Sequence, residues 1–519
     1  MNNSEETYYG SIVWIVKSTP DVARDLQYPV TVVFLVRLVV PSCLLALSCL
    51  LWSLYHHNSR DPALNLPLPP GSMGLPIVGE TLLLMLKGKQ FFESKFKRHG
   101  EVYKTHILGS PVIRVIGAKN AKIILMNENN LVTAYWPESV RRLLGQGSVA
   151  NATRDLHRAR RMAVQKVFSH VAMSDYIPIM QKVVRTCIRH WCGQEMVLGY
   201  PECKNMSFSL AAEALVGFSL SPEEQKGLLD VFSVFTNNLF SLPLPYPGFG
   251  FTKGLAARKI LLRKIKECLE LKMQTMSSED ASSQHDFKDA MSRLLKNHGE
   301  DSVNLPDLMD LCLELLFAGH ATSASAATSI LIYLSQYSDV VTKVQTELEE
   351  HGLGQNREED LCLANLGSLT YVNAVIKEVL RLSPPVGGAF RTVLKSFTLN
   401  NYQIPAGWTL TYSIRETQET SDIFADANKF NPDRWIDHKY PNEKFHYLPF
   451  GGGPRLCLGK EFAKMFLRVF VVELVRSCRW SLVAGSSKMN YLPVPHPVDG
   501  LPVRFSEITS SISPSSNTT

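Results

Sequence analysis

The chain has 519 residues, enough to bury a large core, and its 54 basic and 48 acidic side chains give a formal charge of +6. This charge is too small and too evenly spread to indicate nucleic acid as a partner, but a membrane surface or an acidic protein remains open. The ten cysteines form no C-x-x-C pair and follow no regular spacing, which argues against a zinc site and against a disulfide framework.

The N-terminal part of the sequence predicts a membrane anchor. Leu38–Tyr55 is an uncharged and mostly apolar run that is just long enough to span a bilayer as a helix. The polar and partly acidic segment 1–37 precedes it and no small-residue cleavage site follows, so a retained anchor is favoured over a cleaved signal peptide. An interfacial helix is the other alternative. Residues 56–80 are predicted to form a stiff linker, because four prolines lie within Leu66–Glu80.

The remaining chain predicts one large domain over residues 81–505. Helix-length patterns dominate from about Ser94, with short strand-like pieces such as Pro111–Gly117 and Tyr402–Tyr412 between them. The expected fold class is therefore mainly α with small β-sheets. Residues 506–519 are rich in serine and threonine and are predicted to be a disordered tail.

A long apolar helix is predicted from about Asn304, just before Pro306, to about Tyr337. Its middle, Phe317–Ser325, reads FAGHATSAS and mixes small with hydroxylated residues. Small residues leave room for a large flat ligand, or they serve a close crossing with another helix. The hydroxyl groups can bond the carbonyl one turn back. Both interpretations stay open at this point.

A second unusual stretch is Phe450–Lys464, which reads FGGGPRLCLGKEFAK. Glycine and proline keep the backbone before Cys457 irregular, and a helix is predicted from about Lys460. A cysteine just ahead of a helix N-terminus favours the thiolate form. A nucleophile needs a base and a redox cysteine needs a partner, and the local sequence offers neither. An axial haem ligand needs only the loop and a cation for the propionates, which Arg455 supplies.

The spacing F-x-x-G-x-R-x-C-x-G closely resembles the haem-ligand signature of the cytochrome P-450 family of haem-thiolate monooxygenases. Its positions are filled by Phe450, Gly453, Arg455, Cys457 and Gly459. The resemblance implies the cytochrome P-450 fold, with a single large haem domain behind the N-terminal anchor. It also implies haem b as cofactor, with Cys457 as the axial ligand of the iron.

Other family positions follow in the expected order along the chain. Glu378 and Arg381 match the family's E-x-x-R pair, and three residues apart on a helix they can form an ion pair. Arg434 matches the arginine that completes this structural triad.

The resemblance also implies further residues that contact the cofactor. Arg391 falls where the family usually places another propionate contact. His157 and Arg161 occupy the W-x-x-x-R positions, with His157 replacing the tryptophan.

In the central helix, the family pattern is A/G-G-x-acid-T-T/S. Four residues fit it, namely Ala318, Gly319, Thr322 and Ser323, but Ala321 stands where the acid commonly lies. The acid normally helps to relay protons during oxygen activation. We therefore expect Thr322, Ser323 and ordered water to form the relay, with Gly319 making room for oxygen. His320 is expected to be a packing or surface residue.

Electrons must come from outside the chain, because no dinucleotide-binding fingerprint occurs. The resemblance implies NADPH-cytochrome P-450 reductase as the donor, an endoplasmic reticulum membrane location and a cytosolic catalytic domain. Two groups of basic residues predict a docking face near Cys457, although a solvated helix face is the alternative. They are Lys460, Lys464 and Arg468, and Arg154, Arg158 and Arg160.

A closer resemblance exists to the retinoic-acid-hydroxylating group of the family. It rests on six blocks: Tyr103–Asn120, Tyr135–Ser148, Asn238–Phe249, Leu382–Phe397, Phe445–Lys460 and Val494–Val503. It implies O2-dependent hydroxylation of an apolar carboxylic acid, all-trans-retinoic acid above others. Another substrate, such as a sterol or fatty acid, is the first alternative, and a haem protein that binds a ligand without oxygen chemistry is the second.

A long polyene acid needs an apolar tunnel with a cation at its far end. By likeness, the lining candidates are Trp136, Phe317, Ala318, Val386 and Phe390. Arg114, alone in the apolar strand VIRVIG, is the candidate partner of the carboxylate. A strand arginine that faces solvent is the alternative.

Overall fold

The computed structural model describes residues 30–277, 288–298, 304–355, 359–436, 443–485 and 487–508. Most of the predicted polar segment 1–37 and of the predicted tail 506–519 lies outside these residues. The described chain divides into two units. One comprises the residues up to Arg60 together with Leu75–Ile77, and the other comprises the rest.

The first unit contains one long helix, α2 (Val30–Asn58), which includes the whole predicted anchor Leu38–Tyr55. Its stretch Leu38–His56 has a mean hydropathy of 2.0, and no residue of Leu38–Tyr55 is buried inside the protein. By length and composition this helix is able to cross a membrane.

The second unit is mainly helical, as the sequence predicts. Before the central helix it contains α3 (Thr81–Lys87), α4 (Lys89–His99), α5 (Ala118–Met126), α6 (Glu138–Leu144), α7 (Arg154–Lys166), α8 (His170–Cys192), α9 (Gly199–Leu210), the π-helix η1 (Ala211–Val216), α10 (Pro222–Asn237), α11 (Gly250–Ser277) and α12 (Ala290–His298). The central helix α13 (Leu305–Gln336) is followed by α14 (Ser338–Glu350), α15 (Leu363–Ser368), α16 (Thr370–Leu382), α17 (Arg415–Glu419) and α18 (Lys460–Ser477). The described residues also form the 3-10 turns η4 (Pro432–Trp435), η5 (Glu443–Phe445) and η6 (Gly453–Arg455).

The main sheet has the strand order β1-β2-β8-β5-β3. Its strands are β1 (Val102–Ile107), β2 (Ser110–Val115), β3 (Val132–Ala134), β5 (Gly388–Val393) and β8 (Thr409–Ser413). The β2 and β8 strands are parallel, and the other neighbours are antiparallel. The smaller sheets are formed by β4 (Val197–Leu198), β9 (Cys478–Leu482) and β12 (Pro502–Glu507), by β6 (Phe397–Leu399) and β7 (Tyr402–Ile404), and by β10 (Met489–Asn490) and β11 (His496–Pro497).

The structure contains one of the two predicted strands intact and divides the other. Pro111–Gly117 corresponds to β2. Tyr402–Tyr412 is interrupted, because Pro405 and Gly407 lie in a turn between β7 and β8 and Gly407 has a φ of +80°, a left-handed conformation that glycine adopts readily.

Part of the predicted linker is bound to strands of the second unit. The Lys104 N–H donates to the Pro70 carbonyl (2.8 Å), and the Gln403 N–H donates to the Pro67 carbonyl (3.0 Å). Proline lacks an N–H, but its carbonyl still accepts hydrogen bonds. Residues 61–74 therefore line β1 and β7 instead of forming a free spacer.

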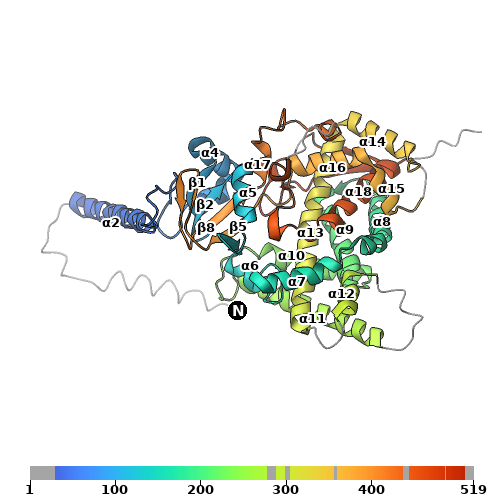
Figure 1. The fold of residues 1–519 in the computed structure, drawn as a ribbon, viewed down its shortest axis with the longest axis horizontal. Coiled ribbons are helices and arrows are strands. Elements are labelled where there is room, and N and C mark those ends of the chain that lie inside the picture. Colours follow the sequence, from blue (N-terminus) through green and yellow to red (C-terminus); the bar gives the residue numbers. More distant parts are fainter. Residues whose placement is uncertain are drawn as a thin grey trace, which may run out of the picture. The chain divides into compact units, whose positions relative to one another are not determined.

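The helix α13 organises the core. It packs against α9, η1 and α18, and Figure 1 shows it (yellow) passing through the helical part of the molecule. Its 32 residues correspond to a rod of about 48 Å. It begins with Pro306 in its first turn, where proline is favoured. The middle of α13 thus lies deep inside the domain, as the sequence predicts.

Candidate active site

The loop before Cys457 is held in one shape by close backbone contacts. Gly453 has a φ of +64°, and a Cβ at this position would lie 2.1 Å from the Leu125 carbonyl oxygen, so only glycine fits. The Cys457 N–H donates to the Phe450 carbonyl (3.0 Å) and closes the loop. Gly459 then lies at the N-terminal cap of α18. The left-handed backbone and the close Leu125 carbonyl explain why the motif needs glycine at Gly453.

The Cys457 side chain is accessible to solvent, yet its surroundings do not favour the thiolate by themselves. Protein packed around the sulfur raises the pKa of the Cys457 thiol, while the Gly459 N–H, Arg161 and Lys460 lower it to a smaller extent. The start of the helix therefore lowers the pKa of the thiol, as expected from the sequence, but desolvation is the larger effect and the net pKa is raised. A metal ion bound to the sulfur would remove the proton outright.

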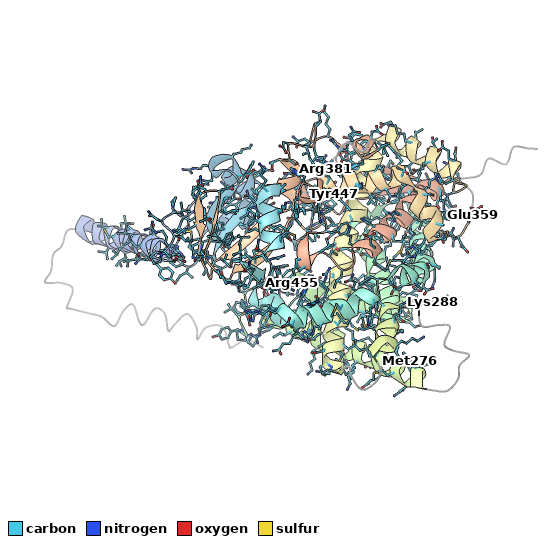
Figure 2. The ribbon with its side chains drawn as sticks, viewed as in Figure 1. Met276, Lys288, Glu359, Arg381, Tyr447 and Arg455 are labelled. Carbon is cyan, nitrogen blue, oxygen red and sulfur yellow. The ribbon has the colours of Figure 1, made fainter. Side chains whose placement is uncertain are left out.

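Basic residues from three parts of the chain meet around this loop. On α7, Arg161 donates to the Leu456 carbonyl next to Cys457 (2.7 Å). In η6, Arg455 donates to the Ala152 carbonyl (2.8 Å). Figure 2 labels Arg455 within the fold. On β5, Arg391 is joined to Arg455 through a shared carboxylate, that of Glu128, which the sequence did not single out.

His157 belongs to the same cluster but carries no charge at neutral pH. Its side chain is buried, and burial, followed by the nearby positive charges of Arg455 and Arg161, lowers the pKa of His157 to about 4. A neutral imidazole next to guanidinium groups is consistent with the replacement of the family's tryptophan, which is also an uncharged ring with an N–H donor.

A second carboxylate that the sequence did not single out holds the loop on which Arg455 rests. Glu314 on α13 accepts the N–H groups of Val149 (2.6 Å) and Ala150 (2.8 Å). Burial raises the pKa of Glu314 to about 7. No motif signals this residue, because an isolated acid in a helix has no distinctive pattern.

On the same face of α13, Glu314, Ala318 and Thr322 follow each other at intervals of four residues. Ala318 is exposed, and the Thr322 hydroxyl donates to the Ala318 carbonyl (2.7 Å). This bond to the preceding turn confirms the expectation from sequence. Ser323 is buried and projects about 100° around the helix from Thr322, so the two hydroxyl groups lie on different faces.

Gly319 and His320 face the neighbouring helices. A Cβ at Gly319 would lie 3.2 Å from a Leu215 methyl group and 3.6 Å from the Ala211 Cβ, both in η1. The space that Gly319 leaves therefore lies toward η1 and serves a close helix crossing, the alternative that the sequence left open.

His320 is buried edge-to-face against Phe208 and Phe232. Burial lowers its pKa to about 3, which confirms the expected packing role.

The predicted substrate residues lie on neighbouring segments. The Tyr135 N–H donates to the Phe390 carbonyl (3.3 Å), which brings Trp136 beside β5. Val386, just before β5, is 39% exposed, and Phe317 is partly buried on α13.

Arg114 does not face solvent: it is 8% exposed. Its guanidinium forms an ion pair with Glu416 (2.7 Å) and lies 3.9 Å above the Phe92 ring.

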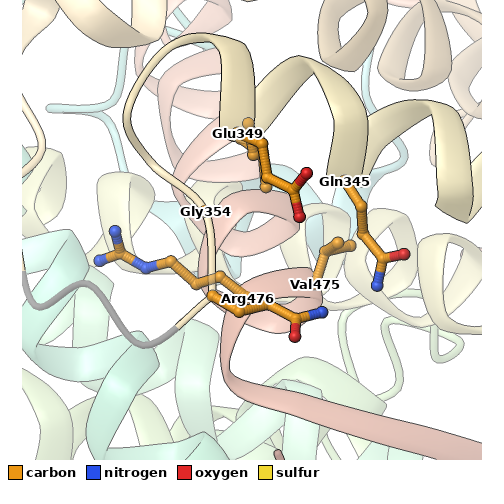
Figure 3. Close-up of a pocket in the computed structure, with 7 residues that line it drawn as sticks. Gln345, Glu349, Gly354, Val475 and Arg476 are labelled. Atoms are coloured by element: carbon orange, nitrogen blue, oxygen red, sulfur yellow. The ribbon is translucent and has the colours of Figure 1, made fainter. Parts of the chain in front are cut away.

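One pocket lies elsewhere. Figure 3 shows it between α14 and the C-terminal end of α18, with Glu349, Gly354 and Arg476 among its lining residues. Arg476 follows the start of α18 by about 24 Å of helix rise. This pocket is therefore separate from the surroundings of Cys457.

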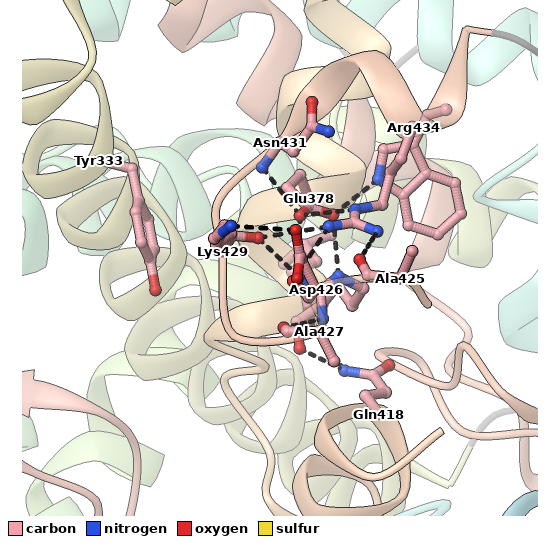
Figure 4. Close-up of polar contacts among 12 residues, drawn as sticks. Tyr333, Glu378, Gln418, Ala425, Asp426, Ala427, Lys429, Asn431 and Arg434 are labelled. Carbon is pink, nitrogen blue, oxygen red and sulfur yellow. Dashed lines mark hydrogen bonds and ion pairs between the residues drawn. The ribbon is translucent and has the colours of Figure 1, made fainter. Parts of the chain in front are cut away.

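The predicted structural triad is confirmed. Glu378 is fully buried and accepts hydrogen bonds from Arg381 (2.9 and 2.8 Å) and from Arg434 (3.0 Å). The Trp435 indole N–H and the Asn431 N–H complete its shell at 2.9 and 3.0 Å (Figure 4). The cluster joins α16 to η4 and carries no free acid or base.

The residues around the Cys457 loop fit a haem. Cys457 is an exposed residue just before α18, three arginines gather near its loop, and the exposed Ala318 lies on the central helix. Residues 69–495 match the model of the family described as Cytochrome P450. The chain belongs to the cytochrome P450 family. It is thus a cytochrome P450 monooxygenase with a haem-thiolate cofactor.

Individual relatives of this P450 cover nearly all of it. It is 43% identical to Cytochrome P450 26A1 of Gallus gallus, over 90% of this chain and 96% of the relative. It is 41% identical to Cytochrome P450 26B1 of Homo sapiens, over 91% and 93%. A solved structure, retinoic acid bound cyanobacterial CYP120A1, aligns with a TM-score of 0.78 and 33% identity, covering 86% of this chain and 100% of that one.

Within this P450, Cys457 would hold the haem iron, and Arg161, Arg391 and Arg455 would hold the propionates with His157. The bound haem supplies the activation of oxygen. The chain itself orients the cofactor, positions the substrate and delivers protons.

Proposed function

We propose that this P450 hydroxylates an apolar carboxylic acid, all-trans-retinoic acid, by inserting one atom of O2 into a C–H bond, with haem b as cofactor. The observation that carries the proposal is the likeness to the retinoic acid bound CYP120A1, which this chain covers along its whole length. The 26A1 and 26B1 relatives support the same assignment.

The proton route must work without an acid at Ala321. Thr322 already donates its own hydroxyl proton to the Ala318 carbonyl, and its oxygen still has lone pairs that can accept from a water molecule. We assign the relay to Thr322 and ordered water, with Ser323 supporting it from the adjacent face. This arrangement replaces a carboxylate by a hydroxyl group that is held in a fixed orientation.

The carboxylate of the substrate needs a cation. Arg114 remains our candidate, although Glu416 balances its charge. The adjacent Arg415 is 7% exposed, and its Nε and Nη2 atoms have no hydrogen-bond partner within the described residues. The neighbouring Lys89 is paired with Glu419 (3.0 Å). Lys89 is also paired with Glu93 (3.1 Å), so the carboxylates of this group equal its cations in number. The carboxylate of an acid bound near Arg114 would instead meet the Nε and Nη2 atoms of Arg415, which are unpartnered in the described part of the chain.

Electrons would come from NADPH through NADPH-cytochrome P450 reductase. Lys460 and Lys464 are 35% and 30% exposed, and Arg154 and Arg158 are exposed, so these four residues can form a basic docking face. Arg160 does not belong to it, because its guanidinium pairs with Asp307 (2.8 Å) on α13. We further propose that α2 anchors the protein in the endoplasmic reticulum membrane, with the catalytic domain in the cytosol.

The test is a substrate panel with purified protein and reductase. Retinoic acid, a sterol and a fatty acid are compared by spectral shift on binding and by product mass. The proposal expects a hydroxylated product from retinoic acid at the highest kcat/KM. Products from the sterol alone would refute the retinoid assignment, and binding without NADPH-dependent product would favour a haem protein that only binds ligands.

A further inference from the structure

Glu128 lies two residues after α5 in a tight turn that leads into β3. Asn129 has a φ of +64°, a left-handed conformation that asparagine tolerates better than most residues. The Ala134 N–H donates to Glu128 Oε1 (2.9 Å), and Glu128 forms a β-bridge with Val132. The turn therefore points the carboxylate inward, where its side chain is 1% exposed.

Each oxygen of this carboxylate faces one of the two arginines expected at the haem propionates. Oε1 lies 3.0 Å from Arg455 Nε, and Oε2 lies 3.0 Å from Arg391 Nε. The arginine side chains are 10% and 5% exposed. Both guanidinium groups are thus paired with Glu128 at Nε. A terminal nitrogen of each also donates to a backbone carbonyl, Arg455 to Ala152 (2.8 Å) and Arg391 to Phe390 (2.8 Å). Glu128 joins the α5–β3 turn, β5 and the cysteine loop in one contact.

The same carboxylate sets the charge of the cluster. Arg161, Arg391 and Arg455 contribute +3, and His157 contributes none at neutral pH because its pKa is lowered to about 4. With −1 from Glu128 the sum is +2, which matches the two propionates of haem. Without Glu128 the cluster would carry +3 against the same two negative charges.

We propose that Glu128 is a positioning residue of the haem site, which fixes Arg391 and Arg455 through their Nε atoms and matches the charge of the cluster to that of the cofactor. Partners behind the groups that hold a cofactor orient those groups, and their loss commonly weakens binding by about 10–100-fold. A positive charge left unbalanced in a buried cluster also stabilises the reduced form of a nearby iron.

The test compares Glu128→Gln with the wild-type holoenzyme in two measurements. These are the midpoint potential of the haem and the rate of haem transfer to apomyoglobin. We expect a more positive potential and haem transfer that is about tenfold faster. Glu473→Gln is the matched control, because Glu473 is equally buried and also pairs with two arginines, Arg185 and Arg476, but at the opposite end of α18. It should leave the potential unchanged.

Glu128→Asp distinguishes the effect of the negative charge from the effect of the carboxylate's position. It also replaces Glu128→Gln as the test variant if the glutamine variant does not retain haem. It keeps the negative charge but shortens the reach, so we expect the wild-type potential with faster haem transfer. An unchanged potential and transfer rate in Glu128→Gln, or an equal shift in Glu473→Gln, would overturn the proposal. A Glu128→Asp variant that matches the wild type in haem transfer would overturn the positioning role.

Discussion

Replacing Glu378 by glutamine tests the buried triad behind the haem loop. The Glu378 and Arg381 side chains are 0% exposed and Arg434 is 4% exposed. Glutamine keeps the shape of the side chain but removes its charge and turns one oxygen into a donor. That donor would face the guanidinium and indole donors that now bond the carboxylate, and both guanidinium groups would lose their counter-charge.

The size of the effect follows from this burial. Breaking a buried ion pair by removing one partner destabilises a protein by about 3–5 kcal/mol, out of a total stability of about 5–15 kcal/mol. At about 1.4 kcal/mol for each factor of ten, the unfolding equilibrium should shift by about a hundredfold to a few thousandfold. We therefore expect the urea midpoint of Glu378→Gln to lie well below that of the wild type.

Urea unfolding followed by circular dichroism measures this prediction through the midpoint and the slope. Asp426→Asn is the control in the same loop, because its ion pair with Lys429 is 69% and 74% exposed and such pairs contribute less than about 1 kcal/mol. A Glu378→Gln midpoint equal to that of the wild type, or an equal loss in Asp426→Asn, would refute the reasoning.

Three further variants test separate parts of the account. Thr322→Ala removes the relay hydroxyl and should lower product formed per NADPH consumed, with a fall of about tenfold or more in product rate. Arg114→Ala should weaken binding of retinoic acid by about tenfold or more but not binding of its neutral ester, as measured by spectral titration. His320→Leu should flatten the loss of stability in acid. The pKa of His320 in the folded state, about 3, lies below the ordinary value of 6.5. As the pH falls from 6.5 toward 3, the histidine is therefore protonated in the unfolded chain before it is protonated in the folded one. In this range the free energy of unfolding of the wild type falls by up to about 1.4 kcal/mol per pH unit.

Each of these variants has a contradicting result. Unchanged coupling in Thr322→Ala would exclude the hydroxyl from the relay. Equal weakening of acid and ester in Arg114→Ala would exclude the carboxylate contact. A pH dependence of the urea midpoint that is the same in His320→Leu and the wild type would place the titration elsewhere.

The sequence predicts the contiguous parts of this site well. The cysteine loop is a local motif, so its glycines, its cation and the helix after it can be read from adjacent residues. The Glu378–Arg381 pair is local too, because two residues spaced three apart on a helix lie on the same face. The long central helix follows from its apolar pattern and from Pro306 near its start.

The parts that the sequence does not predict depend on tertiary contacts. Glu128 meets Arg391 and Arg455 only after the sheet has formed, and nothing in its local sequence distinguishes it from a surface acid. The direction of Gly319 depends on which neighbour packs against α13. Arg160 looks like part of a basic surface until Asp307 is placed opposite it.

The most direct test of the central claim is the mass of the product formed from retinoic acid in isotopically labelled dioxygen, with purified protein, reductase and NADPH. The account predicts a hydroxylated retinoic acid that carries one labelled oxygen atom, and no such product from Cys457→Ala. A product without the label, or no product from retinoic acid while a sterol or fatty acid is hydroxylated, would contradict it.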